Sequence, residues 1–78
     1  MSLAQQLAEK LAIDTVDAAE KLGDETLTEE IARSLGASSP TTEELFRTAV
    51  RTLMAERRAR GVLARKLAKA ADDAPPEG

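Results

Sequence analysis

The chain has 78 residues, of which 42 % are hydrophobic, 32 % charged and 1 % aromatic, and its formal net charge at pH 7 is −3. It contains no cysteine, histidine, tryptophan or tyrosine, which excludes disulfide scaffolds, Cys/His zinc sites and catalysis by histidine or cysteine. No apolar run approaches the ~20 residues of a membrane span and there is no signal-peptide core, so we expect a small, soluble, cytoplasmic, all-α protein.

The first helix is expected over residues 3–22. Ser2 can cap it with its hydroxyl while Gln5, three residues later, reaches back, and Gly23 is a natural stop. Its apolar stripe, at helical spacing and flanked by Ala4, Ala8, Ala12 and Ala19, consists of Leu3, Leu7, Leu11, Ala18 and Leu22.

The middle of this helix departs from the pattern. Ile13 points away from the stripe, Thr15 points into it, and Asp14 could cap a fresh start. The segment is therefore either one helix or two that break near Ile13–Asp14. We favour the continuous helix, in which an exposed Ile13 is a contact residue.

A short second helix is expected over residues 28–35. Thr26 or Thr28 can cap it, Glu29 and Glu30 lie in its first turn where the helix dipole favours acids, and Gly36 ends it. Its apolar side is formed by Leu27, Ile31 and Leu35.

The third helix is expected over residues 40–71, because Ser39 can cap it and Pro40 suits its first position. As heptads, one core position is shared by Phe46, Leu53, Arg60 and Leu67, and the other by Ala49, Glu56, Leu63 and Ala70. Phe46 and Met54 are interpreted as core fillers. A polar waist of Glu56, Arg57 and Arg60 interrupts the apolar face, and Gly61 follows it. The segment is one long helix or two hinged at Gly61, and the single glycine favours one helix.

Residues 28–45 resemble the helix-turn-helix of DNA-binding regulators. Ala32 matches the close contact between the two helices of that motif, and Gly36 matches its turn glycine. Thr42 stands where a branched aliphatic is usual, and residues 39–44, which would enter the major groove, carry two acids and no base. The competing interpretation is a capped helix–Gly–helix corner of an ordinary bundle.

Charge is strongly divided along the chain. Residues 1–46 hold ten acids and three bases, a net charge of −7, and residues 47–71 hold eight bases and one acid, a net charge of +7. The acidic half can pair with the basic helix, within one chain or between two, or the basic segment 47–69 can face a polyanion. Candidate phosphate contacts are Arg47, Arg51 and Arg58, although Glu43–Arg47 and Glu56–Arg60 have the spacing of local ion pairs.

Enzymatic activity is not expected. Glu29 and Glu30, and likewise Glu43 and Glu44, are adjacent in sequence, so their carboxylates diverge by about 100° on a helix and share neither a proton nor a metal. We expect no catalytic residue, no cofactor and no metal site.

These observations predict a single helical domain over residues 1–73, with two shorter helices packed on one long C-terminal helix. Residues 74–78 are expected to form a frayed tail, and residues 1–3 and 77–78 resemble remnants of an expression vector. A helix over residues 40–71 is about 48 Å long, which is more than the two shorter helices can cover. We therefore expect an apolar stripe to stay exposed around Leu63 and Leu67.

The chain is expected to be a non-catalytic protein-interaction module, regulator or adaptor that forms an antiparallel homodimer or binds another protein. The predicted partner interface consists of Leu53, Arg57, Arg60, Leu63 and Leu67. The alternative is a DNA-associated regulator that uses residues 28–45 and the basic segment 47–69, and a third interpretation is a docking module from a larger protein. No membrane partner is expected.

Overall fold

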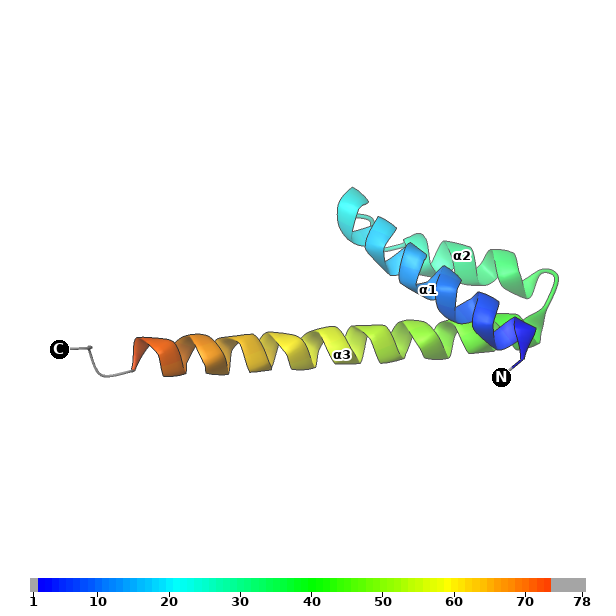
Figure 1. The fold of residues 1–78 in the computed structure, drawn as a ribbon. Coiled ribbons are helices and arrows are strands. Elements are labelled where there is room, and N and C mark those ends of the chain that lie inside the picture. The colour runs from blue at the N-terminus through cyan, green and yellow to red at the C-terminus, as the bar shows by residue number, and fades with distance from the viewer. Residues whose placement is uncertain (1, 74–78) are drawn as a thin grey trace.

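A computed structural model describes residues 2–73 and consists of three helices: α1 (Leu3–Leu22), α2 (Leu27–Gly36) and α3 (Pro40–Asp72). The shorter helices pack on the N-terminal half of α3, while the rest of α3 extends beyond them (Figure 1). This arrangement confirms the expected all-α fold with two shorter helices on a long one. The predicted tail, residues 74–78, lies outside the described residues.

Both ends of α1 and the start of α3 are set by the capping residues read from the sequence. The Ser2 hydroxyl accepts a hydrogen bond from the Gln5 backbone N–H at 3.0 Å, and Gly23 closes α1 in the left-handed conformation with φ of 63°. The Ser39 hydroxyl accepts from the Thr42 backbone N–H at 3.2 Å, with Pro40 in the first turn of α3. These side chains satisfy N–H groups that have no partner inside the helix.

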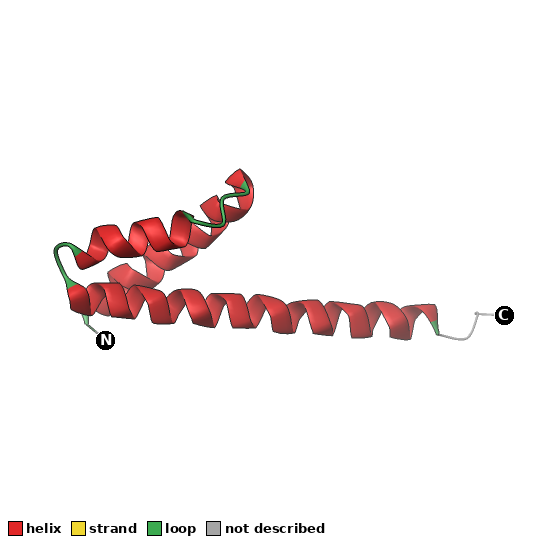
Figure 2. Ribbon diagram, turned by 180° about the vertical axis from the view of Figure 1, so that it is seen from behind, coloured by secondary structure: helices red, strands yellow, loops and turns green. Residues whose placement is uncertain are grey.

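Both helices in question are continuous. α1 runs through Ile13 and Asp14, and α3 runs through Gly61, which confirms the favoured prediction of one helix in each case; the alternatives, a break at Ile13–Asp14 and a hinge at Gly61, do not form. Short loops connect the three helices, and α2 and α3 lie nearly antiparallel (Figure 2).

The start of α2 differs from the expected threonine cap. Thr26 occupies the cap position, but its side chain makes no capping hydrogen bond. Instead, Asp24 Oδ1 accepts from the Thr26 backbone N–H at 2.9 Å and from its hydroxyl at 2.8 Å. These two bonds, chiefly the one from the hydroxyl, hold the pKa of Asp24 below its usual value.

The core is centred on the buried Phe46, which packs with three buried alanines, Ala8, Ala12 and Ala32. The expectation that the leucine stripe is the inner face of α1 holds for Leu11, which packs against the core. It was wrong for Leu3, Leu7 and Leu22, whose exposed fractions are 69 %, 57 % and 70 %. Small alanine side chains let the backbone of α1 approach the Phe46 ring closely. The adjacent leucine side of α1 is left toward solvent.

Of two other predictions about the core, the one for Thr15 and Ile13 is confirmed and the one for Met54 is wrong. Thr15 is buried while Ile13 is exposed, as their positions on the helix predicted. Met54, expected to fill the core, is exposed instead, since Phe46 and the partly buried Val50 and Leu53 cover that side of the core.

Gly36 does not act as a left-handed turn residue. It is the last residue of α2, and among the described residues only Gly23 has a positive φ. A Cβ at Gly36 would overlap the carboxylate of Glu43, with the carboxylate carbon only 2.8 Å away. A side chain at Gly36 would therefore require the carboxylate of Glu43, which is paired with Arg47, to move.

Candidate interaction surface

Arg57 joins the middle of α3 to the end of α1. Its guanidinium lies 2.7 Å from the Asp17 carboxylate and is also paired with Glu20. The hydrogen bonds that the guanidinium donates to these two carboxylates, chiefly the one to Asp17, raise the pKa of Arg57. Arg57 was predicted to face a partner, but its charge is already matched within the chain.

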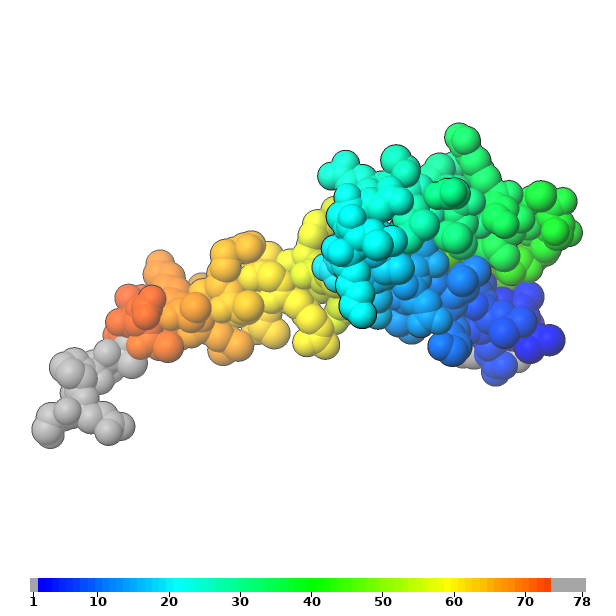
Figure 3. All heavy atoms as spheres, turned by 90° about the horizontal axis from the view of Figure 1, so that it is seen from above, coloured from blue at the N-terminus to red at the C-terminus, as the bar shows by residue number. Residues whose placement is uncertain are grey.

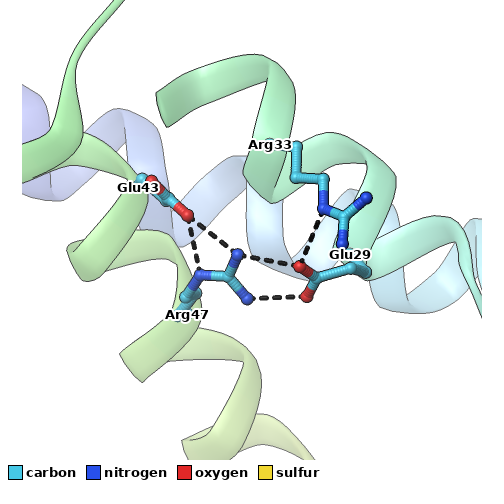
Figure 4. A network of polar contacts seen from close by, with 4 residues as sticks. All are labelled: Glu29, Arg33, Glu43 and Arg47. Atoms are coloured by element: carbon cyan, nitrogen blue, oxygen red, sulfur yellow. Dashed lines mark hydrogen bonds and ion pairs between the residues drawn. The ribbon is translucent and has the colours of Figure 1, made fainter. Parts of the chain in front are cut away.

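Arg47 ties α3 to α2 in a four-residue network (Figure 4). Its two terminal nitrogens lie 2.7 and 3.0 Å from the oxygens of Glu29, and its Nε donates to Glu43 at 2.9 Å. Arg33 adds a contact to Glu29 at 3.3 Å from the same helix. Hydrogen bonding from Arg47 is the main reason that the pKa of Glu29 falls from 4.5 to about 2.

The three candidate phosphate contacts therefore differ in availability. Arg47 is half-buried and paired with two carboxylates, whereas no carboxylate within residues 2–73 pairs with Arg51 or Arg58. The α2–α3 corner is an antiparallel hairpin, while a helix-turn-helix crosses its two helices at ~90–120°. The three arginines lie on one side of the continuous α3, but only Arg51 and Arg58 remain available for a phosphate.

The C-terminal part of α3, residues 62–72, projects from the rest of the molecule and is here called the arm. Every residue from Val62 to Asp72 is exposed, and the long dimension of the molecule is 64 Å against 30 and 13 Å for the other two. Seen from above, the arm is a narrow rod that leaves the broader body of the three packed helices (Figure 3). Leu63 and Leu67 are 55 % and 62 % exposed, as the sequence predicted.

The arm is helical without tertiary cover. A separate helix of this length is marginal in water because nucleation is unfavourable, but the arm only extends a helix that the body has already nucleated. Its composition of mainly Ala, Leu, Lys and Arg also has high helix propensity. The helix thus holds Leu63 and Leu67 one turn apart in a fixed direction.

A groove runs between α1 and α3 on the body and has a volume of about 300 Å³. We call it the α1–α3 groove; it is lined by Gln5, Glu9, Ile13, Leu45, Thr48, Ala49, Thr52 and Leu53. Ile13, whose exposure the sequence had singled out, forms part of its α1 wall. Leu53, a predicted interface residue, lies at the edge of the core and lines the groove.

The groove and the apolar side of the arm lie on one continuous face of α3. Leu53 and Leu67 are fourteen residues apart, which at about 100° per residue brings them within about 40° of the same direction. Between them, Glu56 and Arg60 form an ion pair along the helix. We call this face the seam; it consists of Ala49, Leu53, Glu56, Arg60, Leu63 and Leu67.

A larger groove of about 590 Å³ opens on another side of the body, between the end of α1, the start of α2 and α3. Met54 and Arg58 supply its α3 wall, and Glu20, Asp24 and Glu25 contribute acidic side chains. Arg58 comes two residues after Glu56, so it points about 160° away from the seam. No sequence pattern indicated this groove, since segments distant in the chain form it: the end of α1, the loop after it, the start of α2 and the middle of α3.

Within residues 2–73, no three acidic side chains lie close enough together to hold a metal ion, and no helix is both long and apolar enough to cross a membrane. No protein-family model matches the chain, and no match was found among the curated proteins or the solved structures. The site residues are therefore interpreted from their own geometry.

Proposed function

We propose that this chain is a non-catalytic protein-interaction module that self-associates through the seam of α3. The observation that carries the proposal is the uncovered apolar side of the arm, where Leu63 and Leu67 stand more than half exposed. Covering such side chains with a second surface releases water and stabilises the complex by roughly 25 cal/mol of free energy per Å² of apolar area buried. An exposed apolar stripe of this kind is typical of an interaction site.

The body already has its main charges paired and its core filled, which supports assigning the interaction to the arm. Arg47 and Arg57 use their charges to hold α2 and α1 on α3, and Phe46 fills the core. The arm contributes nothing to this packing, because each of its side chains is exposed. A helix extended by three turns beyond its own fold is therefore best explained by a partner.

Sedimentation equilibrium of the purified chain tests this proposal. We expect the mass of a dimer, and we expect the double substitution Leu63→Glu with Leu67→Glu to give a monomer that retains its helical circular dichroism. Val62→Glu is the matched control, because Val62 is equally exposed but points away from the seam. A monomeric parent chain would overturn self-association.

A DNA-associated regulator is the second candidate, favoured by the basic side chains Arg51, Arg58, Arg65, Lys66 and Lys69. It has less support, because Arg47 is already paired and α2 and α3 are nearly antiparallel. Fluorescence anisotropy with mixed-sequence duplex DNA tests it. Binding that weakens steeply with salt would favour this candidate, since each phosphate contact releases counterions.

A further inference from the structure

The seam is complementary to itself when it is reversed. Its order from the body to the arm is apolar, acidic, basic, apolar: Ala49 and Leu53, then Glu56, then Arg60, then Leu63 and Leu67. Reversing this order brings basic opposite acidic and apolar opposite apolar. In antiparallel helix pairs the two core positions of the heptad face each other, and the seam residues occupy these positions.

We infer that the arm of one copy lies antiparallel in the α1–α3 groove of a second copy, in a register centred between Glu56 and Arg60. The inference rests on the proposed self-association and specifies its geometry. In this register Arg60 faces Glu56 of the second copy, Leu63 faces Leu53, and Leu67 faces Ala49. Each pair occurs twice, because the arrangement has two-fold symmetry.

The shape of the groove fits this occupant. Leu67 is a large side chain, and it comes opposite the small Ala49, which lines the groove. Leu63 comes opposite Leu53 at the end of the groove nearest the arm. Large side chains opposite small ones interdigitate, which is how packed helices fill the space between them.

One edge of the arm is also suited to α1 of the second copy. This edge carries three small side chains at helical spacing, Ala64, Ala68 and Ala71. It continues the side of α3 on which Arg57 reaches Asp17 of α1, and in an antiparallel pair like edges adjoin. The alanine edge of the arm therefore meets the groove wall formed by Ile13 and Glu9 of the second copy, and small side chains permit that close approach.

Charge favours the antiparallel direction over the parallel one. The arm carries three bases and one acid, and none of Arg65, Lys66 and Lys69 is paired with a carboxylate within residues 2–73. An antiparallel pair places this basic arm beside the body of the other copy. That body contains most of residues 1–46, the segment with a net charge of −7. A parallel pair would place two basic arms side by side, where they repel.

Cysteine crosslinking tests the register, and the absence of natural cysteine makes every crosslink assignable. Ala49→Cys and Leu67→Cys are made as separate variants, mixed in equal amounts and treated with a short bismaleimide. We expect the mixed 49–67 dimer as the main product and little crosslinking of either variant alone. Ala49→Cys mixed with Val62→Cys is the control and should give only background, because Val62 points away from the seam.

The possible outcomes are distinct. Crosslinks of 49 to 49 and of 67 to 67 would overturn the antiparallel register, and the proposed self-association would stand. A dimeric mass without a 49–67 crosslink would also overturn the register alone. If Ala49→Cys, Leu67→Cys and the parent chain were all helical and all had the mass of a monomer, the register and the proposed function would both be overturned.

Discussion

Arg47 and Glu29, eighteen residues apart in the sequence, form a two-point ion pair that holds α2 against α3. The two nitrogen–oxygen distances are 2.7 and 3.0 Å, and the guanidinium is oriented by Glu43 from its own helix. Paired parallel contacts of this kind fix geometry as well as charge.

This ion pair makes the stability of the fold depend on pH. Because the pKa of Glu29 falls from 4.5 to about 2 on folding, the pair stabilises the fold above about pH 4.5. Its contribution is lost as the pH falls from 4.5 through about 2. We expect Glu29→Gln to lower the melting temperature at pH 7, and the difference from the parent chain to vanish near pH 2.

Glu30→Gln is the control for this prediction, because Glu30 is exposed and forms no ion pair within residues 2–73. It should leave the melting temperature close to that of the parent chain at every pH. Thermal melts followed by circular dichroism between pH 2 and 7 measure both variants. A difference for Glu29→Gln that stayed constant over this range would contradict the assignment.

Ala32 provides a test of the close contact between α2 and the core. It is buried beside Phe46, so Ala32→Leu should overpack the site and lower the free energy of unfolding by about 1–3 kcal/mol. Ser34→Leu, on the exposed side of α2, should change stability little. Urea denaturation measures both, and equal tolerance of the two changes would mean that α2 packs loosely.

Gly61 is expected to be a replaceable residue. It lies inside the continuous α3, and the nearest atom to a Cβ there is an Arg65 nitrogen at 3.6 Å, which is ordinary contact. Gly61→Ala should therefore raise stability by up to about 1 kcal/mol, because alanine has the higher helix propensity. Gly23→Ala is the opposite case and should destabilise, because φ is 63° there. A loss of stability in Gly61→Ala would indicate a bend that the glycine permits.

The ion pair in the middle of the seam is expected to set orientation at a cost in stability. Replacing Glu56 and Arg60 together by leucine should raise the melting temperature, because the seam becomes apolar throughout. It should also allow both orientations, so that 67–67 crosslinks appear beside the 49–67 product. Arg58→Leu, which lies away from the seam, should leave the crosslinking pattern unchanged. Aggregation without any gain in stability would show that Glu56 and Arg60 face solvent.

Both ends of α1 and the start of α3 could be predicted because local groups fix them. Ser2, Gly23, Ser39 and Pro40 act within a few residues of their own positions, so their effects can be read from the sequence. Phe46 could be identified as a core residue as well, because a single large aromatic dominates the burial available to a small chain.

The inner face of α1 could not be read in the same way. The leucine stripe and the alanine stripe have the same period, and hydrophobicity alone favours leucine. The choice between them depends on how near α1 can come to Phe46, which is a property of the packed helices. The ion pairs of Arg57 depend on the same packing, since its partners Asp17 and Glu20 lie on another helix.

The uncovered arm has a consequence for amide hydrogen exchange. Its backbone hydrogen bonds are opened by fraying from the Asp72 end, and no side-chain packing opposes that opening in a single copy. Protection should therefore decline residue by residue from Gly61 to Asp72 at high dilution. As concentration rises and a second copy covers the arm, this gradient should flatten, because the terminal turns then open only when the two copies separate.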